Sequence, residues 1–74
     1  MSHDRLVYMA NQIGRFFATQ PHDAAVAAIK DHLTRFWDPR MRRGILEELA
    51  NPAAGMDPLV REAVEALQAP APAG

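Results

Sequence analysis

The sequence predicts an all-α protein, a small bundle of four short helices with a disordered C-terminal tail. Two observations lead to this fold class. Large apolar residues recur three and four positions apart within each segment, which is the spacing that aligns side chains on one face of a helix. Proline-containing turn signals at 20–21, 38–39 and 51–58 separate the segments of the 74-residue chain, and none of these segments reads as a strand.

The first helix is expected at about residues 4–18 and the second at about 22–37. The apolar face of the first helix consists of Leu6, Met9, Ala10, Ile13, Phe16 and Phe17. The apolar face of the second consists of Ala25, Val26, Ile29, Leu33 and Phe36. Because each helix is apolar on one side only, the helices must pack against one another.

The third and fourth helices are expected at about 39–50 and 58–68, and each begins at an Asp-Pro pair. An aspartate such as Asp38 accepts a backbone N–H bond of the new helix, and proline suits the first helical position because no donor is needed there. Their apolar residues are Met41, Ile45, Leu46 and Leu49, then Leu59, Val60, Ala63, Val64 and Leu67. Residues 69–74 lack large apolar side chains, so a flexible Ala/Pro tail is expected beyond a helical domain of residues 1–68.

The composition excludes several classes of site. The chain has no cysteine, which excludes disulfides, thiolate-bound metals and iron-sulfur ligation. A net charge of -1 gives no overall attraction to nucleic acid or to an anionic membrane. The N-terminus lacks the apolar core of a signal peptide and no apolar run could span a bilayer, so we expect a cytoplasmic protein that binds neither nucleic acid nor membrane.

No set of residues predicts a catalytic, cofactor-binding or metal site in this chain. The histidines, His3, His22 and His32, are not spaced three or four apart, and no carboxylate completes a metal set with them. His32 borders the apolar face of the second helix, where a structural histidine, hydrogen-bonded at the edge of the core, is expected. The chain is therefore not expected to be an enzyme on its own.

The corner between the second and third helices, residues 36–43, carries three arginines. Arg40, Arg42 and Arg43 fall in the first turn of the third helix, where the macrodipole disfavours each exposed cation by roughly 0.3 to 1 kcal/mol. Two explanations stay open. The guanidinium groups bond the free carbonyls at the end of the second helix, for which Arg42 is best placed, or the outward-facing Arg40 and Arg43 meet an acidic or phosphate group of a partner.

Trp37, the only tryptophan, stands beside these arginines. On a helical wheel it flanks the apolar face of the second helix, which predicts a ring half buried at the corner. The alternative is an interface anchor, because tryptophans near arginines are enriched at binding hot spots. The residues predicted to touch a partner are Trp37, Arg40 and Arg43.

Small residues form a second pattern, on the first two helices. They are Ala10, Gly14 and Ala18 on one side of the first, and Ala24, Ala27 and Ala28 on the back of the second. Alanine at these positions is explained by helix propensity alone, or these are flat surfaces against which another protein packs. Both interpretations stay open.

Two stretches carry a resemblance to a known family. They are Met9-Ala10-Asn11-Gln12-Ile13-Gly14, within residues 6–17, and Phe36-Trp37-Asp38-Pro39-Arg40-Met41-Arg42, within residues 32–42. Together with Asp57-Pro58-Leu59-Val60 they make the chain resemble, over about residues 5–67, the delta subunit of NAD-dependent, molybdenum-containing formate dehydrogenases.

The resemblance implies a small accessory subunit, without catalytic residues, in a cytoplasmic complex. The larger subunits, with the molybdenum-binding one as the expected partner, would then hold the molybdenum cofactor, iron-sulfur clusters, FMN and the NAD site. The implied role is to stabilise the complex or to assist its assembly and cofactor insertion. An alternative comes from the residues alone: two short helices that meet at a basic corner can mimic a helix-turn-helix module that binds nucleic acid, although the net charge argues against it.

Overall fold

The four expected helices are present in a computed structural model of the chain, which describes residues 3–68. They are α1 His3–Phe17, α2 His22–Phe36, α3 Pro39–Glu47 and α4 Pro58–Gln68. No strand forms within the described range, so the all-α fold class is confirmed. The tail expected at 69–74 lies outside the described residues.

The third helix ends earlier than expected. Its α-helical part stops at Glu47, and Glu48–Ala50 form a short 3₁₀ turn, η1. Pro52 follows directly after Asn51 and disfavours helical geometry there, so the chain tightens into a 3₁₀ turn instead of adding a further α-helical turn. The N–H of Asn51 closes this turn on the carbonyl of Glu48 at 3.1 Å.

Asp38 begins α3 in the way its sequence position predicts. Its Oδ1 accepts the backbone N–H of Met41 at 2.9 Å, and Pro39 occupies the first turn. This hydrogen bond is the main cause that lowers the pKa of Asp38, and the nearby charges of Arg40 and Arg42 act in the same direction. Asp38 is therefore the N-cap residue of α3, and it directly follows Trp37, the C-cap residue of α2.

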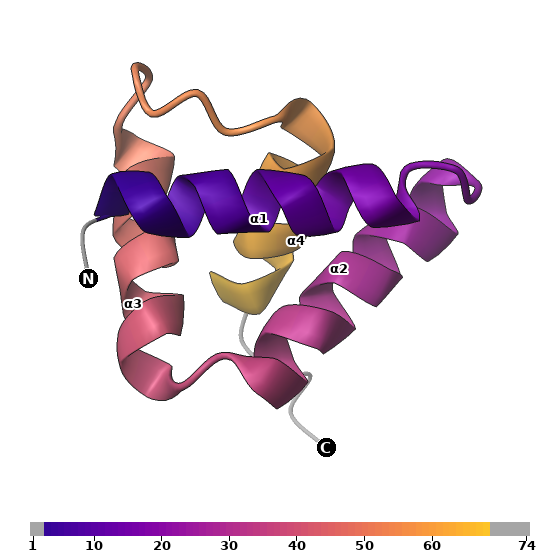
Figure 1. Cartoon of the computed structure of the whole chain (residues 1–74), viewed down its shortest axis with the longest axis horizontal. Coiled ribbons are helices and arrows are strands. Elements are labelled where there is room, and N and C mark those ends of the chain that lie inside the picture. The colour runs from indigo at the N-terminus through magenta and orange to yellow at the C-terminus, as the bar shows by residue number, and fades with distance from the viewer. Residues whose placement is uncertain (1–2, 69–74) are drawn as a thin grey trace.

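The helices enclose one core, to which all four contribute. In Figure 1, α1 lies across α3 and α4, while α2 runs obliquely beside α4 and packs against it. The largest fully buried side chains come from three of the helices and are Ile29, Leu33, Ile45, Val60 and Val64. The remaining helix, α1, covers these side chains with Leu6, Val7 and Ala10.

Two glycines allow α1 to approach its neighbours closely. A Cβ added at Gly14 would lie 2.4 Å from Cγ2 of Val60 in α4, and one added at Gly44 of α3 would lie 2.5 Å from Cδ1 of Leu6. Both separations are shorter than any ordinary carbon contact. The missing side chains thus set the distance at which α1 crosses α4 and α3.

The connection between η1 and α4 is held by a residue of α1. Asn11 donates from Nδ2 to the carbonyl of Gly55 at 3.0 Å, and its Oδ1 accepts the N–H of Asp57 at 2.9 Å. Gly55 has φ of +77°, in the left-handed region that favours glycine. A side-chain amide at position 11 therefore fixes a loop more than forty residues away in the sequence.

Two aromatic residues expected in the core lie on the surface instead. Phe16 is 76% exposed and Phe36 is 71% exposed. Adjacent helical residues point about 100° apart, and at this end of α1 Phe17, not Phe16, packs against the core. Phe36 is the last residue of α2, and the next residue along the chain takes its expected place in the core.

Candidate functional site

The arginines of the corner divide between two roles. Arg42 donates from Nη1 to the carbonyl of Thr34 at 3.2 Å and also to the carbonyl of Trp37. Thr34 lies in the last turn of α2 and Trp37 is its C-cap residue, so neither carbonyl has a further helical N–H available to it. The prediction that Arg42 caps the second helix is confirmed.

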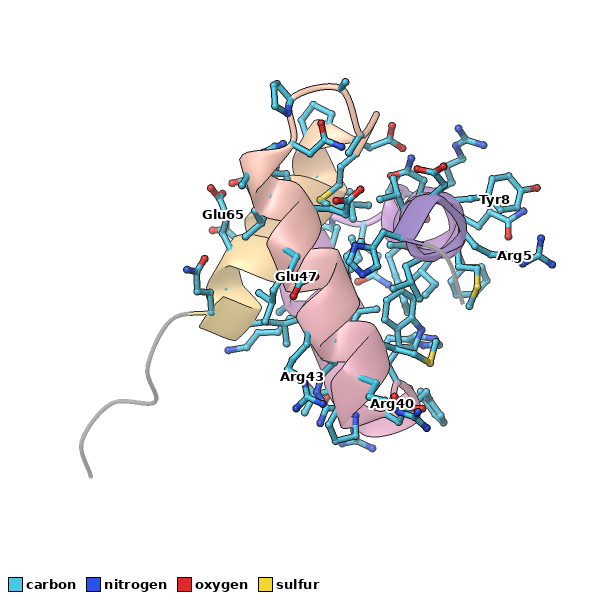
Figure 2. All side chains as sticks on the ribbon, turned by 90° about the vertical axis from the view of Figure 1, so that its left-hand side faces the viewer. Arg5, Tyr8, Arg40, Arg43, Glu47 and Glu65 are labelled. Carbon is cyan, nitrogen blue, oxygen red and sulfur yellow. The ribbon has the colours of Figure 1, made fainter. Side chains whose placement is uncertain are left out.

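Arg40 and Arg43 do not share this role. Both are exposed, and Figure 2 shows them at the end of α3 that begins at the corner, with their side chains directed away from the helix. Neither forms an ion pair with any carboxylate of residues 3–68, in contrast to Arg35, which pairs with Asp31 at 3.0 Å. Partner contact by these two arginines stays a prediction.

Trp37 is more deeply buried than the half-buried ring expected from the wheel. It is 5% exposed and belongs to the core cluster. The wheel assumed that α2 includes this residue, but the backbone of Trp37 is extended, with φ of -93° and ψ of 137°, so its side chain leaves the helical path and turns inward. Trp37 is therefore a core residue beneath the corner. The aromatic ring that is exposed at the corner belongs to the preceding residue, Phe36.

An apolar groove lies between α1 and α2, and the sequence did not predict it. We call it the aromatic groove: a cavity of about 430 Å³ flanked by Phe36 and lined by Met9, Gln12, Ile13, Phe16, Phe17, His32 and Trp37. Most of the residues that line it are only partly buried. The signal that could have suggested it is the Phe16-Phe17 pair, because adjacent helical residues point about 100° apart and the second large ring then lies toward the edge of the core face.

The rings along this groove contact one another in series. Phe16 and Phe17 meet edge to face with centroids 5.0 Å apart, Phe17 lies 6.3 Å from the ring of His32, and His32 lies 4.8 Å from that of Phe36. His32 was expected to be hydrogen-bonded at the edge of the core. It is at that edge, but within residues 3–68 its side chain makes aromatic contacts and no hydrogen bond.

A second cavity, of about 440 Å³, lies on the other side of the corner. Its lining residues come from the beginnings of α1 and α3 and are His3, Leu6, Asp38, Arg40 and Met41. Trp37 lines the aromatic groove and the next residue, Asp38, lines this second cavity. The two hollows are therefore neighbours, with an apolar lining on one side of the corner and Arg40 on the other.

The two groups of small residues have different surroundings. Ala10 and Gly14 are buried, and α4 of the same chain occupies the space beside Gly14, so the flat surface predicted there is used for internal packing. Ala18 is exposed beyond the end of α1. On α2, Ala24 and Ala27 are exposed, and both interpretations of that face stay open.

The described residues offer no cluster of side chains suited to metal binding. Over residues 3–68, no group of three or more histidine, aspartate or glutamate side chains is placed to hold a metal ion. Nε2 of His22 lies 2.9 Å from Oε2 of Glu62, so this histidine joins α2 to α4 in a surface pair. The hydroxyl of Thr34 donates to the carbonyl of Lys30 at 2.8 Å. With no cysteine in the chain, an iron-sulfur cluster does not fit these residues.

The comparisons with known proteins agree with the resemblance carried by the two motifs. Within the described range, no helix has both the length and the apolar character needed to cross a membrane. No curated protein and no solved structure matched the chain. The profile of one family, described as the NADH-dependent formate dehydrogenase delta subunit FdsD, matches residues 5–64. This match covers α1 from Arg5 onward, α2, α3 and α4 as far as Val64, including the aromatic groove and the corner, and the chain therefore belongs to the family of formate dehydrogenase delta subunits.

Proposed function

We propose that this delta subunit is a non-catalytic accessory protein that stabilises its formate dehydrogenase complex or assists its assembly and cofactor insertion. Two observations support this role: the chain belongs to the delta-subunit family, and its surface combines exposed aromatic rings beside the groove with two exposed arginines that form no ion pair within residues 3–68. Monomeric proteins rarely leave such apolar surface uncovered unless it binds something. The surface suits protein recognition.

In this proposal the larger subunits carry out the reaction of formate with NAD to give CO2 and NADH. They would hold the molybdenum cofactor, iron-sulfur clusters, FMN and NAD, and the molybdenum-binding subunit is the expected partner. The complex would work in the cytoplasm. Docking would use the corner, with Arg40 and Arg43 in contact with the partner and Trp37 as the buried support beneath them.

Deletion of this chain from the co-expressed complex tests the proposal. The expected result is a complex with less bound molybdenum and lower formate oxidation, and re-expression of the chain should restore both. Loss of molybdenum would indicate a role in cofactor insertion, whereas loss of activity with the metal retained would indicate structural support. A complex that assembles fully, with normal metal content and activity, would contradict the accessory role.

Two charge reversals test the use of the corner. Arg40→Glu/Arg43→Glu should reduce co-purification of the chain with the complex, because both side chains are exposed and would then repel an acidic partner surface. The matched control is Lys30→Glu, since Lys30 is an exposed cation on α2 without an ion pair inside the described range. Unchanged co-purification of the arginine variant would remove the corner from the proposal and leave the accessory role standing.

A further inference from the structure

The aromatic groove is the least expected surface of this protein. Three large hydrophobic side chains of the described residues are more than half exposed, and two of them, Phe16 and Phe36, flank the groove. The third is Tyr8, whose hydroxyl accepts a hydrogen bond from the groove residue Gln12 at 3.1 Å. The exposed aromatic surface of the chain is therefore concentrated in one place, where α1 faces α2.

The rings of the groove form a connected series of aromatic contacts between α1 and α2. Phe17 packs against the core, and the contacts from Phe16 through Phe17 and His32 to Phe36 join α1 to the end of α2. A binding surface whose side chains are already ordered loses less conformational entropy on association. The geometry therefore favours a groove that receives side chains from outside.

Charge at one end of the groove limits what can occupy it. Trp37 lines the groove, and the next residue, Asp38, lines the neighbouring cavity together with Arg40. Arg40 and Arg43, exposed in the first turn of α3, have no carboxylate partner in an ion pair within the described part of the chain. The nearest acid, Asp38, already accepts the N–H of Met41. The dipole of α3 adds positive potential at the same point. A segment that fills the groove and passes the corner should carry carboxylates there.

We propose that the aromatic groove binds an amphipathic helix of a larger formate dehydrogenase subunit, with apolar side chains in the groove and aspartate or glutamate beside Arg40 and Arg43. This inference rests on the proposed accessory function and names the surface and the partner chemistry that the function would use. Helices commonly bind in this manner, with apolar residues one turn apart as anchors in a preformed groove. The corner then supplies orientation and the groove supplies affinity.

The test measures binding of the purified full-length chain to a complex expressed without it. Phe16→Gln/Phe36→Gln should weaken the Kd by about tenfold or more, which is typical when central aromatic anchors are lost. Both residues are more than 70% exposed, so the variant should keep its fold, which circular dichroism checks. The matched control, Ala24→Gln/Ala27→Gln, introduces the same side chains at exposed positions of α2 and should leave the Kd unchanged.

A second measurement uses no substitution. Hydroxyl-radical footprinting should show that Phe16, Phe36 and Met9 become protected when the wild-type chain binds the complex. Full reactivity of these residues in the bound state would overturn the inference, and so would a wild-type Kd for the groove variant or a weaker Kd for the alanine-face control alone. A dimer of the free chain that the groove variant abolishes would also overturn it, because the occupant would then be a second copy.

The outcomes separate this inference from the function on which it rests. If the wild-type chain does not bind the complex expressed without it, the accessory function fails. If the wild-type chain binds and the groove variant binds equally well, only the groove assignment fails. If the groove variant binds weakly but the Arg40→Glu/Arg43→Glu variant binds with the wild-type Kd, the helix binds in the groove, but the claim that it carries carboxylates beside Arg40 and Arg43 is wrong.

Discussion

Arg42 donates a hydrogen bond from its guanidinium group to the backbone carbonyl of Trp37, so the first turn of α3 caps the end of α2. A second bond from the same nitrogen reaches the carbonyl of Thr34. The dipole of α3 disfavours a cation at this position, and the two bonds offset that cost because they satisfy carbonyls left free at the end of α2. The corner is therefore fixed by a side chain as well as by the Asp38-Pro39 pair.

Arg42→Ala should lower the free energy of unfolding by about 1.5 to 3 kcal/mol, the usual scale for hydrogen bonds that involve a charged group, here at a partly buried site. Urea unfolding followed by circular dichroism measures this change. The control is Arg43→Ala, which removes an exposed arginine from the same turn and should change stability by less than about 0.5 kcal/mol. Equal losses in the two variants would contradict the capping role.

Truncation should cost much more stability at Trp37 than at Phe36. Trp37→Ala removes a core side chain that is 5% exposed and should lower the free energy of unfolding by about 3 to 5 kcal/mol. Phe36→Ala removes a ring that is 71% exposed and should cost less than about 1 kcal/mol, most of it from the contact with His32. Thermal or urea unfolding of both variants tests the assignment, and a larger loss at Phe36 would contradict it.

The local features of the fold could be read from the sequence. The three- and four-residue spacing located all four helices, and the Asp38-Pro39 pair located the start of α3 and its capping aspartate. Even the bond from Arg42 to the end of α2 followed from the position of that arginine one turn past the corner. Each of these features depends on residues near one another in the chain, so a helical wheel and capping chemistry suffice.

The remaining features depend on where helices cross. The helical wheel treated Trp37 as part of α2, but the helix ends at Phe36. As a result Phe36, expected in the core, is exposed, and Trp37, expected to be half buried, lies in the core. The aromatic groove lies between α1 and α2, which run obliquely to each other in Figure 1, and no local pattern in the sequence encodes that relative orientation. The same holds for Gly14, whose neighbour Val60 is distant in sequence and close in space.

Gly14→Ala should destabilise the protein because its methyl group would enter the space of Val60. Val60 is fully buried and β-branched, so it cannot rotate away easily. Overpacking costs about 1 to 3 kcal/mol, and the better helix propensity of alanine returns about 1 kcal/mol, so the net loss in the free energy of unfolding should be at most about 2 kcal/mol.

Gly44→Ala is the matched comparison for this crossing. Its methyl group would meet the end of the flexible Leu6 side chain, which can move aside, so it should destabilise less than Gly14→Ala. Thermal unfolding of both variants gives the order. A Gly14→Ala protein at least as stable as the wild type would show that α1 and α4 are not held at the close distance described.

Asp38 should make the stability of the corner depend on pH. The pKa of its carboxyl is lowered in the folded protein, chiefly by the N–H of Met41 and further by the charges of Arg40 and Arg42. For a lowered pKa, the stabilisation is present above the unfolded-state pKa of about 3.9 and is lost as the pH falls through the lower folded-state value.

Asp38→Asn keeps an oxygen that can accept the N–H of Met41 but removes the titrating charge. The wild type should therefore be more stable than Asp38→Asn at pH 6, and the difference should shrink as the pH falls from about 5 toward about 2. Urea unfolding of both proteins across this range measures the difference, in which the other carboxyl groups cancel because both proteins contain them. A difference that does not change with pH would mean that the charge of Asp38 contributes nothing to the start of α3.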